Sequence, residues 1–128
     1  MTEFMDALSI TSSGLRAQSA RLRHISENIA NADTPGYRRK TVSFKTELHG
    51  AEGTVIVGRV NLDQSELERI YDPSHPMADD TGHFDGSNVD AVIEIADARE
   101  AQRSYEANLK MFEQTRKMSS NLLELLRR

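Results

Sequence analysis

The C-terminal third of the chain constrains the fold most, because no Gly or Pro occurs between residues 87 and 128. Apolar residues recur there at spacings of three, four and seven, which is typical of one face of a helix. Ser87 or Asn88 is placed to cap the first turn. The sequence therefore predicts a helix of about 38 residues. Its apolar face comprises Ala91, Ile95, Ala98, Tyr105, Leu109, Phe112, Leu122 and Leu126.

The N-terminal segment predicts a second long helix, from about residue 4 to residue 31. Leu8, Leu15, Leu22 and Ile29 recur every seven residues, and such a narrow stripe is typical of a coiled-coil seam. The helix should end before Pro35 and Gly36, which favour a turn. At 1.5 Å per residue it is about 40 Å long, too long to be enclosed within so small a chain.

Composition argues against a large independent core. Leu, Ile, Val and Phe make up 28 of 128 residues, about 22%, which is just above the roughly 20% below which charged chains tend to be disordered. We therefore expect disordered termini in the free monomer. The absence of Cys excludes disulfides, zinc–thiolate sites and a thiol nucleophile.

Charge and periodicity divide the chain into three parts. The net charge of −4 is the sum of +3 over residues 1–45, −10 over 46–97 and +3 over 98–128. The acidic middle carries strand-like stretches at 41–45 and 54–60, followed by a connector at 61–87 that we expect to be exposed and extended. The predicted fold is mainly α with a small β-rich middle segment, divided into residues 1–34, 35–87 and 88–128.

Motifs for catalysis, cofactor binding and metal binding are missing. His75 and His83 flank acidic residues, but their spacing matches neither a helix face nor a calcium-binding loop. The basic run at 38–40 has no interleaved aromatics, so it is a weak indication of nucleic-acid binding. Met1 to Ile10 carries no Lys or Arg, and no apolar run approaches 18 residues, so we expect no cleaved signal peptide and no membrane insertion. The sequence predicts no catalytic, cofactor-binding or metal site.

Two sets of motifs are specific enough to indicate a protein family. The segment NIANADTPGYRR at residues 28–39 resembles the N-terminal signature of flagellar rod, hook and related axial proteins. Residues 71–76 (YDPSHP), 88–90 (NVD) and 103–108 (RSYEAN) resemble, in order and spacing, the proximal members of the flagellar basal-body rod protein family. This resemblance covers essentially the whole chain, including its length.

The resemblance implies a structural subunit that assembles helically into the flagellar drive shaft, transmits motor torque and encloses the export channel. In that family the terminal helices pair as an antiparallel coiled coil in the inner layer, and the middle segment packs outward. The implied partners are the rod subunits FlgB, FlgF and FlgG, the adaptor FliE at the MS ring, and the flagellar type III export apparatus. The implied location is the periplasmic rod, reached without a cleaved signal peptide.

Several residues have expected roles if the chain is such a rod subunit. Phe4 and Leu8 fit a short element read at the export gate, although they could equally be a pair on the helix seam. The turn motif should cap the first helix and fix the angle of the outer segment, with an ordinary turn as the alternative; it comprises Asn28, Asn31, Thr34, Pro35, Gly36 and Tyr37. The expected subunit or coiled-coil contacts are Leu15, Leu22, Ile25, Ile29, Tyr105, Asn108, Leu109, Phe112, Leu122 and Leu126.

Two other function classes fit part of the sequence. A small cytosolic coiled-coil adaptor or export chaperone would share the amphipathic ends and the acidic middle. A small acid-rich hydrolase is the third candidate, and it would require metal binding near His75 and His83.

Overall fold

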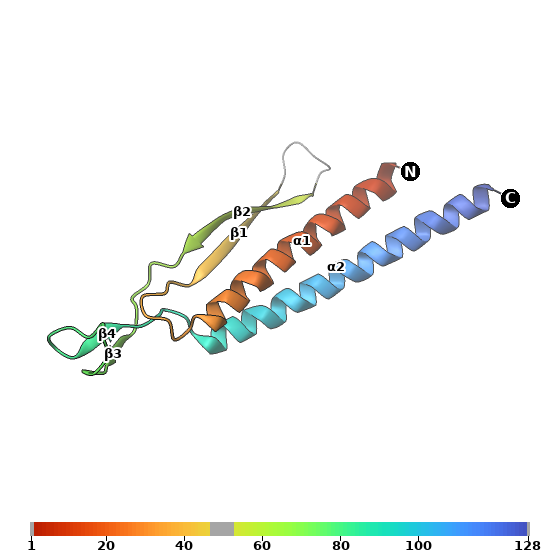
Figure 1. The fold of residues 1–128 in the computed structure, drawn as a ribbon. Coiled ribbons are helices and arrows are strands. Elements are labelled where there is room, and N and C mark those ends of the chain that lie inside the picture. The colour runs from red at the N-terminus through yellow and green to blue at the C-terminus, as the bar shows by residue number, and fades with distance from the viewer. Residues whose placement is uncertain (1, 47–52, 128) are drawn as a thin grey trace.

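Two long helices dominate the structure, a computed structural model that describes residues 2–46 and 53–127. Helix α1 spans Thr2–Ala30 and helix α2 spans Ala91–Leu126. They lie side by side and run in opposite directions, so that α1 begins and α2 ends at the same end of the pair (Figure 1). The mainly helical fold predicted from the 3.6-residue periodicity is confirmed.

Small and polar residues dominate the interior between the helices. Ala17 and Ala101 are buried, and a Cβ atom on Gly14 would lie 2.9 Å from Asn108 Oδ1, so the two helices approach closely there. By contrast, Ile95 of the predicted apolar face of α2 is 48% exposed and Leu126 is 73% exposed. Large apolar side chains of α2 therefore remain accessible to other molecules.

Strands β1 (Lys40–Thr46) and β2 (Val55–Leu62) pair antiparallel along one side of α1 (Figure 1). The register shifts between Val42 and Phe44. The Ser13 hydroxyl of α1 accepts a hydrogen bond of 3.0 Å from the Val55 backbone N–H, which attaches the hairpin to the helix. The two strands expected from alternation and β-branched residues are confirmed.

The prediction of an extended connector at 61–87 is wrong in part. Strands β3 (Arg69–Tyr71) and β4 (His83–Asp85) form an antiparallel ribbon beyond the ends of the helices (Figure 1). The Asp79 carboxylate organises the intervening turn, because it accepts hydrogen bonds from the backbone N–H groups of Thr81 and His83. Phe84 is buried and stacks on the His75 ring, with centroids 3.9 Å apart. Local turn chemistry and contacts between rings, which also include Tyr71 on His83, therefore fold a segment that lacks strand periodicity.

The protein has a large surface for its mass. A compact monomer of 14.4 kDa is expected to expose about 6,800 Å², whereas this chain exposes 9183 Å². Within residues 2–46 and 53–127, the buried apolar side chains are those of Ala17, Ile25, Phe84 and Ala101. No helix in the described ranges is long and apolar enough to cross a membrane.

Candidate functional site

Asn28 connects the end of α1 to the rest of the molecule. Its side chain is fully buried. Its Oδ1 accepts hydrogen bonds from the Lys40 backbone N–H and the Tyr37 hydroxyl, each 2.9 Å long. Its Nδ2 donates to the Lys40 carbonyl at 2.9 Å and to Glu94 Oε2 at 3.3 Å. These four bonds use the full hydrogen-bonding capacity of the amide and join α1, β1 and α2 at one point.

Arg39 neutralises the carboxylates at the start of α2. Its Nε donates to Glu94 Oε1, and its Nη2 donates to Asp97 Oδ2 at 2.7 Å. Glu94 is completely buried, and a buried charge is tolerated only when it is paired and hydrogen-bonded. Burial acts to lower the pKa of Arg39, but the hydrogen bond and negative charge of Glu94, with the charges of Asp97 and Asp63, outweigh it and raise the pKa. Arg39 therefore stays charged.

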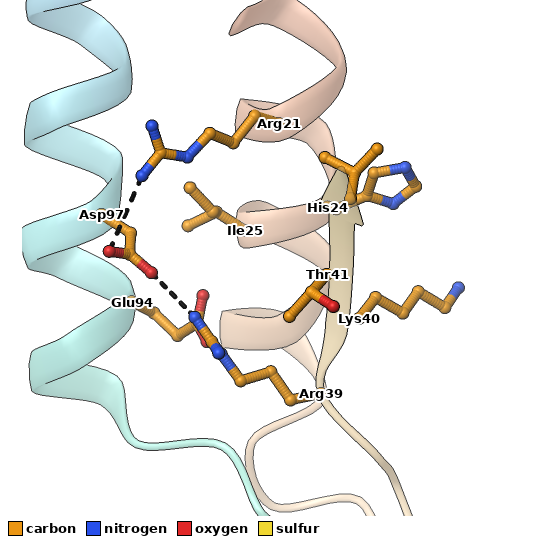
Figure 2. Close-up of a pocket in the computed structure, with 9 residues that line it drawn as sticks. Arg21, His24, Ile25, Arg39, Lys40, Thr41, Glu94 and Asp97 are labelled. Carbon is orange, nitrogen blue, oxygen red and sulfur yellow. Dashed lines mark hydrogen bonds and ion pairs between the residues drawn. The ribbon is translucent and has the colours of Figure 1, made fainter. Parts of the chain in front are cut away.

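Figure 2 shows Arg21 joined to this network through Asp97, whereas the Lys40 side chain points away from it. Arg21 Nη2 lies 3.7 Å from Asp97 Oδ1, and Lys40 Nζ lies 2.9 Å from Glu27 Oε2. The hydrogen bond from Lys40 lowers the pKa of Glu27, and the same bond raises the pKa of Lys40. The cavity between these side chains has a volume of about 180 Å³. Its opposite charges are paired with one another, so the arrangement serves to hold the elements together.

The turn after α1 connects that helix to the ribbon. Asn31 Nδ2 donates to the Glu27 carbonyl at 2.8 Å, and the Thr34 hydroxyl donates to Asn31 Oδ1 at 3.1 Å. Gly36 has a φ of 76°, a conformation that favours glycine, and its N–H donates to the carbonyls of Asp85 and Gly86. The residues that the resemblance singled out therefore gather at the junction of α1, β1 and β4.

The predicted cap of the second helix is wrong. Asp90 is the N-cap, and its carboxylate accepts a 2.9 Å hydrogen bond from the Val92 backbone N–H. Ser87 instead donates from its hydroxyl to the Ala32 carbonyl. Asn88 accepts from the Arg39 backbone N–H at 2.6 Å and donates to the Asp63 carbonyl at 2.9 Å. Both side chains are held by partners distant in sequence, which local pattern does not reveal.

The expected contact residues fall into three groups by exposure. Ile25 is buried, and Ile29, Leu122 and Leu126 are exposed. The remaining ones are half-buried, namely Leu15, Leu22, Tyr105, Asn108, Leu109 and Phe112. Phe4 and Leu8 near the start of α1 are half-buried as well.

His75 and His83, the histidines of the β3–β4 ribbon, each contact a neighbouring residue of the ribbon through Nδ1. His75 Nδ1 accepts a hydrogen bond from the Met77 backbone N–H, and His83 Nδ1 lies 3.1 Å from the Thr81 hydroxyl. Within residues 2–46 and 53–127, no group of three or more His, Asp and Glu residues is arranged to hold a metal ion.

Sequence reasoning missed the Arg39–Glu94–Asp97 cluster. The basic run at 38–40 gives only a weak indication of nucleic-acid binding and does not reveal its carboxylate partners. A signal was available, because Glu94 and Asp97 are three residues apart and so share one face of a helix. Two carboxylates on the face of a helix that packs in the interior require a cation nearby.

Comparison with known proteins agrees with the motifs. Residues 8–38 match the family described as "Flagella basal body rod protein", and residues 80–125 match "Flagellar basal body rod FlgEFG protein C-terminal". The flagellar basal-body rod protein FlgC of Agrobacterium fabrum is 47% identical, over 96% of this chain and 98% of that protein. FlgC of Salmonella typhimurium is 33% identical over 94% and 96%, and FlgC of Bacillus subtilis is 32% identical over 98% and 99%. The resemblance seen in the motifs is therefore confirmed, and the chain belongs to the flagellar basal-body rod protein family, among the relatives of FlgC.

Proposed function

We propose that the chain is a structural subunit of the proximal part of the flagellar basal-body rod. It assembles helically into the drive shaft, transmits motor torque and encloses the export channel. The observation that carries this proposal is the match to FlgC of Agrobacterium fabrum, which is 47% identical and extends over nearly the full length of both chains. The same full-length match favours a rod subunit over a cytosolic adaptor or export chaperone. The family is a structural one, and we assign no catalytic role.

The large exposed surface supports a subunit whose apolar side chains are covered by neighbouring subunits in the assembly. Exposed area exceeds that of a compact monomer by about 2,400 Å². Several large apolar side chains of α2 are exposed, among them Val92, Ile93, Met111, Leu125 and Leu126. Large exposed apolar areas mark sites of protein association. In a helical array each subunit has several different neighbours, which together can cover such a surface.

The helix pair suits the inner layer of a tube. We infer that residues 1–34 and 88–128 form this layer as an antiparallel coiled coil, while residues 35–87 face outward. The close approach of Gly14 to Asn108 supports tight pairing. The predicted contact residues on both helices then divide between the seam within one subunit and contacts between subunits, with the exposed Ile29, Leu122 and Leu126 among the latter.

The junction at Asn28 and Arg39 suits the transmission of torque. Four hydrogen bonds from one buried amide and a chain of ion pairs hold three elements at fixed angles. We infer that the turn motif sets the direction in which the outer segment leaves the helix pair.

Assembly requires partners and a route to the periplasm. By family analogy, FlgB, FlgF, FlgG and FliE are the proposed neighbours, and the flagellar type III apparatus exports the chain without a cleaved signal. Phe4 and Leu8 lie one helical turn apart, so they can present a joint apolar element to the export gate. A small apolar core and termini that are disordered in the free monomer would ease passage through a narrow channel.

Deletion of the gene in its own bacterium tests this function. Deletion should abolish swimming and leave basal bodies that lack a rod when viewed by electron microscopy. The wild-type gene supplied in trans should restore both. Normal rods in the deletion strain would contradict the proposal, and loss of export before any rod substrate is secreted would favour a chaperone.

A further inference from the structure

A shallow groove lies on the face of α2 that points away from α1. Its volume is about 400 Å³, and it is lined by Val92, Ile95, Ala96, Arg99, Glu100 and Arg103. Val92 is 75% exposed and Ile95 is 48% exposed. Glu94 and Ala101, which are fully buried, occupy the opposite side of the same helical turns. We call this surface the α2 groove.

The unpaired charges of the α2 groove are positive, because its carboxylates pair with arginines of the same chain. Glu100 lies 3.4 Å from Arg21 of α1, and nearby Asp97 is held by Arg21 and Arg39. Arg99 and Arg103 form no ion pair or side-chain hydrogen bond with the described residues. The groove therefore combines exposed aliphatic side chains with two cations that are free to bind an external partner.

The β3–β4 ribbon has the complementary chemistry. Residues 63–85, which we call the acidic ribbon, contain seven acidic residues and one basic residue, Arg69. Arg69 is occupied by Asp79 and Asp85. Glu66, Glu68 and Asp80 are exposed and have no side-chain partner among residues 2–46 and 53–127. Two large side chains of the ribbon are also exposed, Tyr71 at 67% and Met77 at 63%.

We propose that the acidic ribbon of one copy of this chain docks in the α2 groove of a second copy. Tyr71 and Met77 would cover Val92 and Ile95, and the free carboxylates would pair with Arg99 and Arg103. The ribbon projects beyond the ends of the helices (Figure 1), so it is placed to reach the first turns of α2 in a neighbour.

The contact joins two different patches, so it is heterologous and repeats without closing into a dimer. Such a contact suits a rod, and the inference rests on the proposed function in that respect. The proposed contact is tested on the purified chain, however, so a negative result there would leave the genetic test of rod assembly unaffected.

A charge-swap experiment on the full-length chain tests the proposal. Variant A carries Arg99→Glu and Arg103→Glu, and variant B carries Glu66→Lys, Glu68→Lys and Asp80→Lys, which reverse all three unpaired carboxylates of the ribbon. In each variant alone, the unpaired charged side chains of the groove and of the ribbon have the same sign, so self-association measured by analytical ultracentrifugation should weaken at least about tenfold. An equimolar mixture restores opposite charges at every contact, because the ribbon of A fits the groove of B and the ribbon of B fits the groove of A.

The expected result is association in the mixture and monomers in each variant alone. Misfolding cannot produce this pattern, and helix content by circular dichroism provides a further check. Lys110→Glu with Lys117→Glu is the matched control, because it changes the same net charge further along α2 and should leave association unchanged. A mixture that stays monomeric would overturn the proposal, as would a wild-type chain that does not self-associate. Association that survives the reversals in both variants would assign the groove to a different segment or chain.

Discussion

Replacement of Asn28 by Ala should destabilise the fold severely. The side chain is fully buried and makes four hydrogen bonds. Three of them join neutral groups and contribute about 1 kcal/mol each, and the bond to the Glu94 carboxylate contributes about 2 kcal/mol. The higher helix propensity of Ala offsets about 0.6 kcal/mol of this loss. The expected loss in the free energy of unfolding is therefore about 4 kcal/mol, a large part of the stability of a small domain.

Urea unfolding followed by far-ultraviolet circular dichroism measures this loss, because the midpoint shifts in proportion to stability when the slope is unchanged. Asn31→Ala is the matched control. Asn31 lies one turn later, in a half-buried position, where it donates one side-chain bond to the Glu27 carbonyl and accepts one from the exposed Thr34 hydroxyl. Its replacement should therefore cost about 1–2 kcal/mol. If Asn28→Ala costs no more than Asn31→Ala, the junction does not hold the elements together as described.

Three further predictions concern assembly, acidity and the termini. Leu126→Asp should abolish rod assembly and swimming while export continues, because this exposed side chain is a proposed contact between subunits; normal swimming would show that the contact is dispensable. Hydrogen bonds from Thr81 and Arg69 hold the pKa of Asp79 well below its ordinary value. The stability that they provide is present above the unfolded pKa of about 3.9 and is lost as the pH falls through the lower folded value. NMR signals of the ribbon should therefore keep their dispersion at pH 5 and lose it in stronger acid, and loss near pH 6 would contradict this. In the free monomer, amides of the last turns of α2 should exchange rapidly with solvent, and strong protection there would refute disordered termini.

The helices and the first hairpin were predictable because their signals are periodic and local. Leu8, Leu15 and Leu22 identify α1 by their seven-residue spacing, and β-branched residues identify β2. Periodicity identified the side of α2 that faces α1 only in part. Ile95 and Leu126 lie on the predicted apolar face and are exposed, whereas Glu94 and Ala101 are buried. An apolar pattern shows which side chains avoid water, but in an assembling protein a neighbouring subunit can cover them as well as the chain itself.

The ribbon and the junction depend on contacts that single-sequence patterns do not contain. Strands β3 and β4 are three residues each, too short for alternation to be detected. Asn88 resembles a helix cap locally, yet its side chain binds Arg39, 49 residues away. The turn motif was singled out by resemblance, whereas the Glu94 carboxylate that Asn28 binds became apparent only from the three-dimensional arrangement.

Purification of hook–basal bodies from cells that carry a tagged copy of the chain tests the central claim most directly. A structural rod subunit should remain with the basal bodies through detergent extraction and be detected at the rod by immunoelectron microscopy. A chain found wholly in the soluble fraction, with complete rods present in the same cells, would contradict the account.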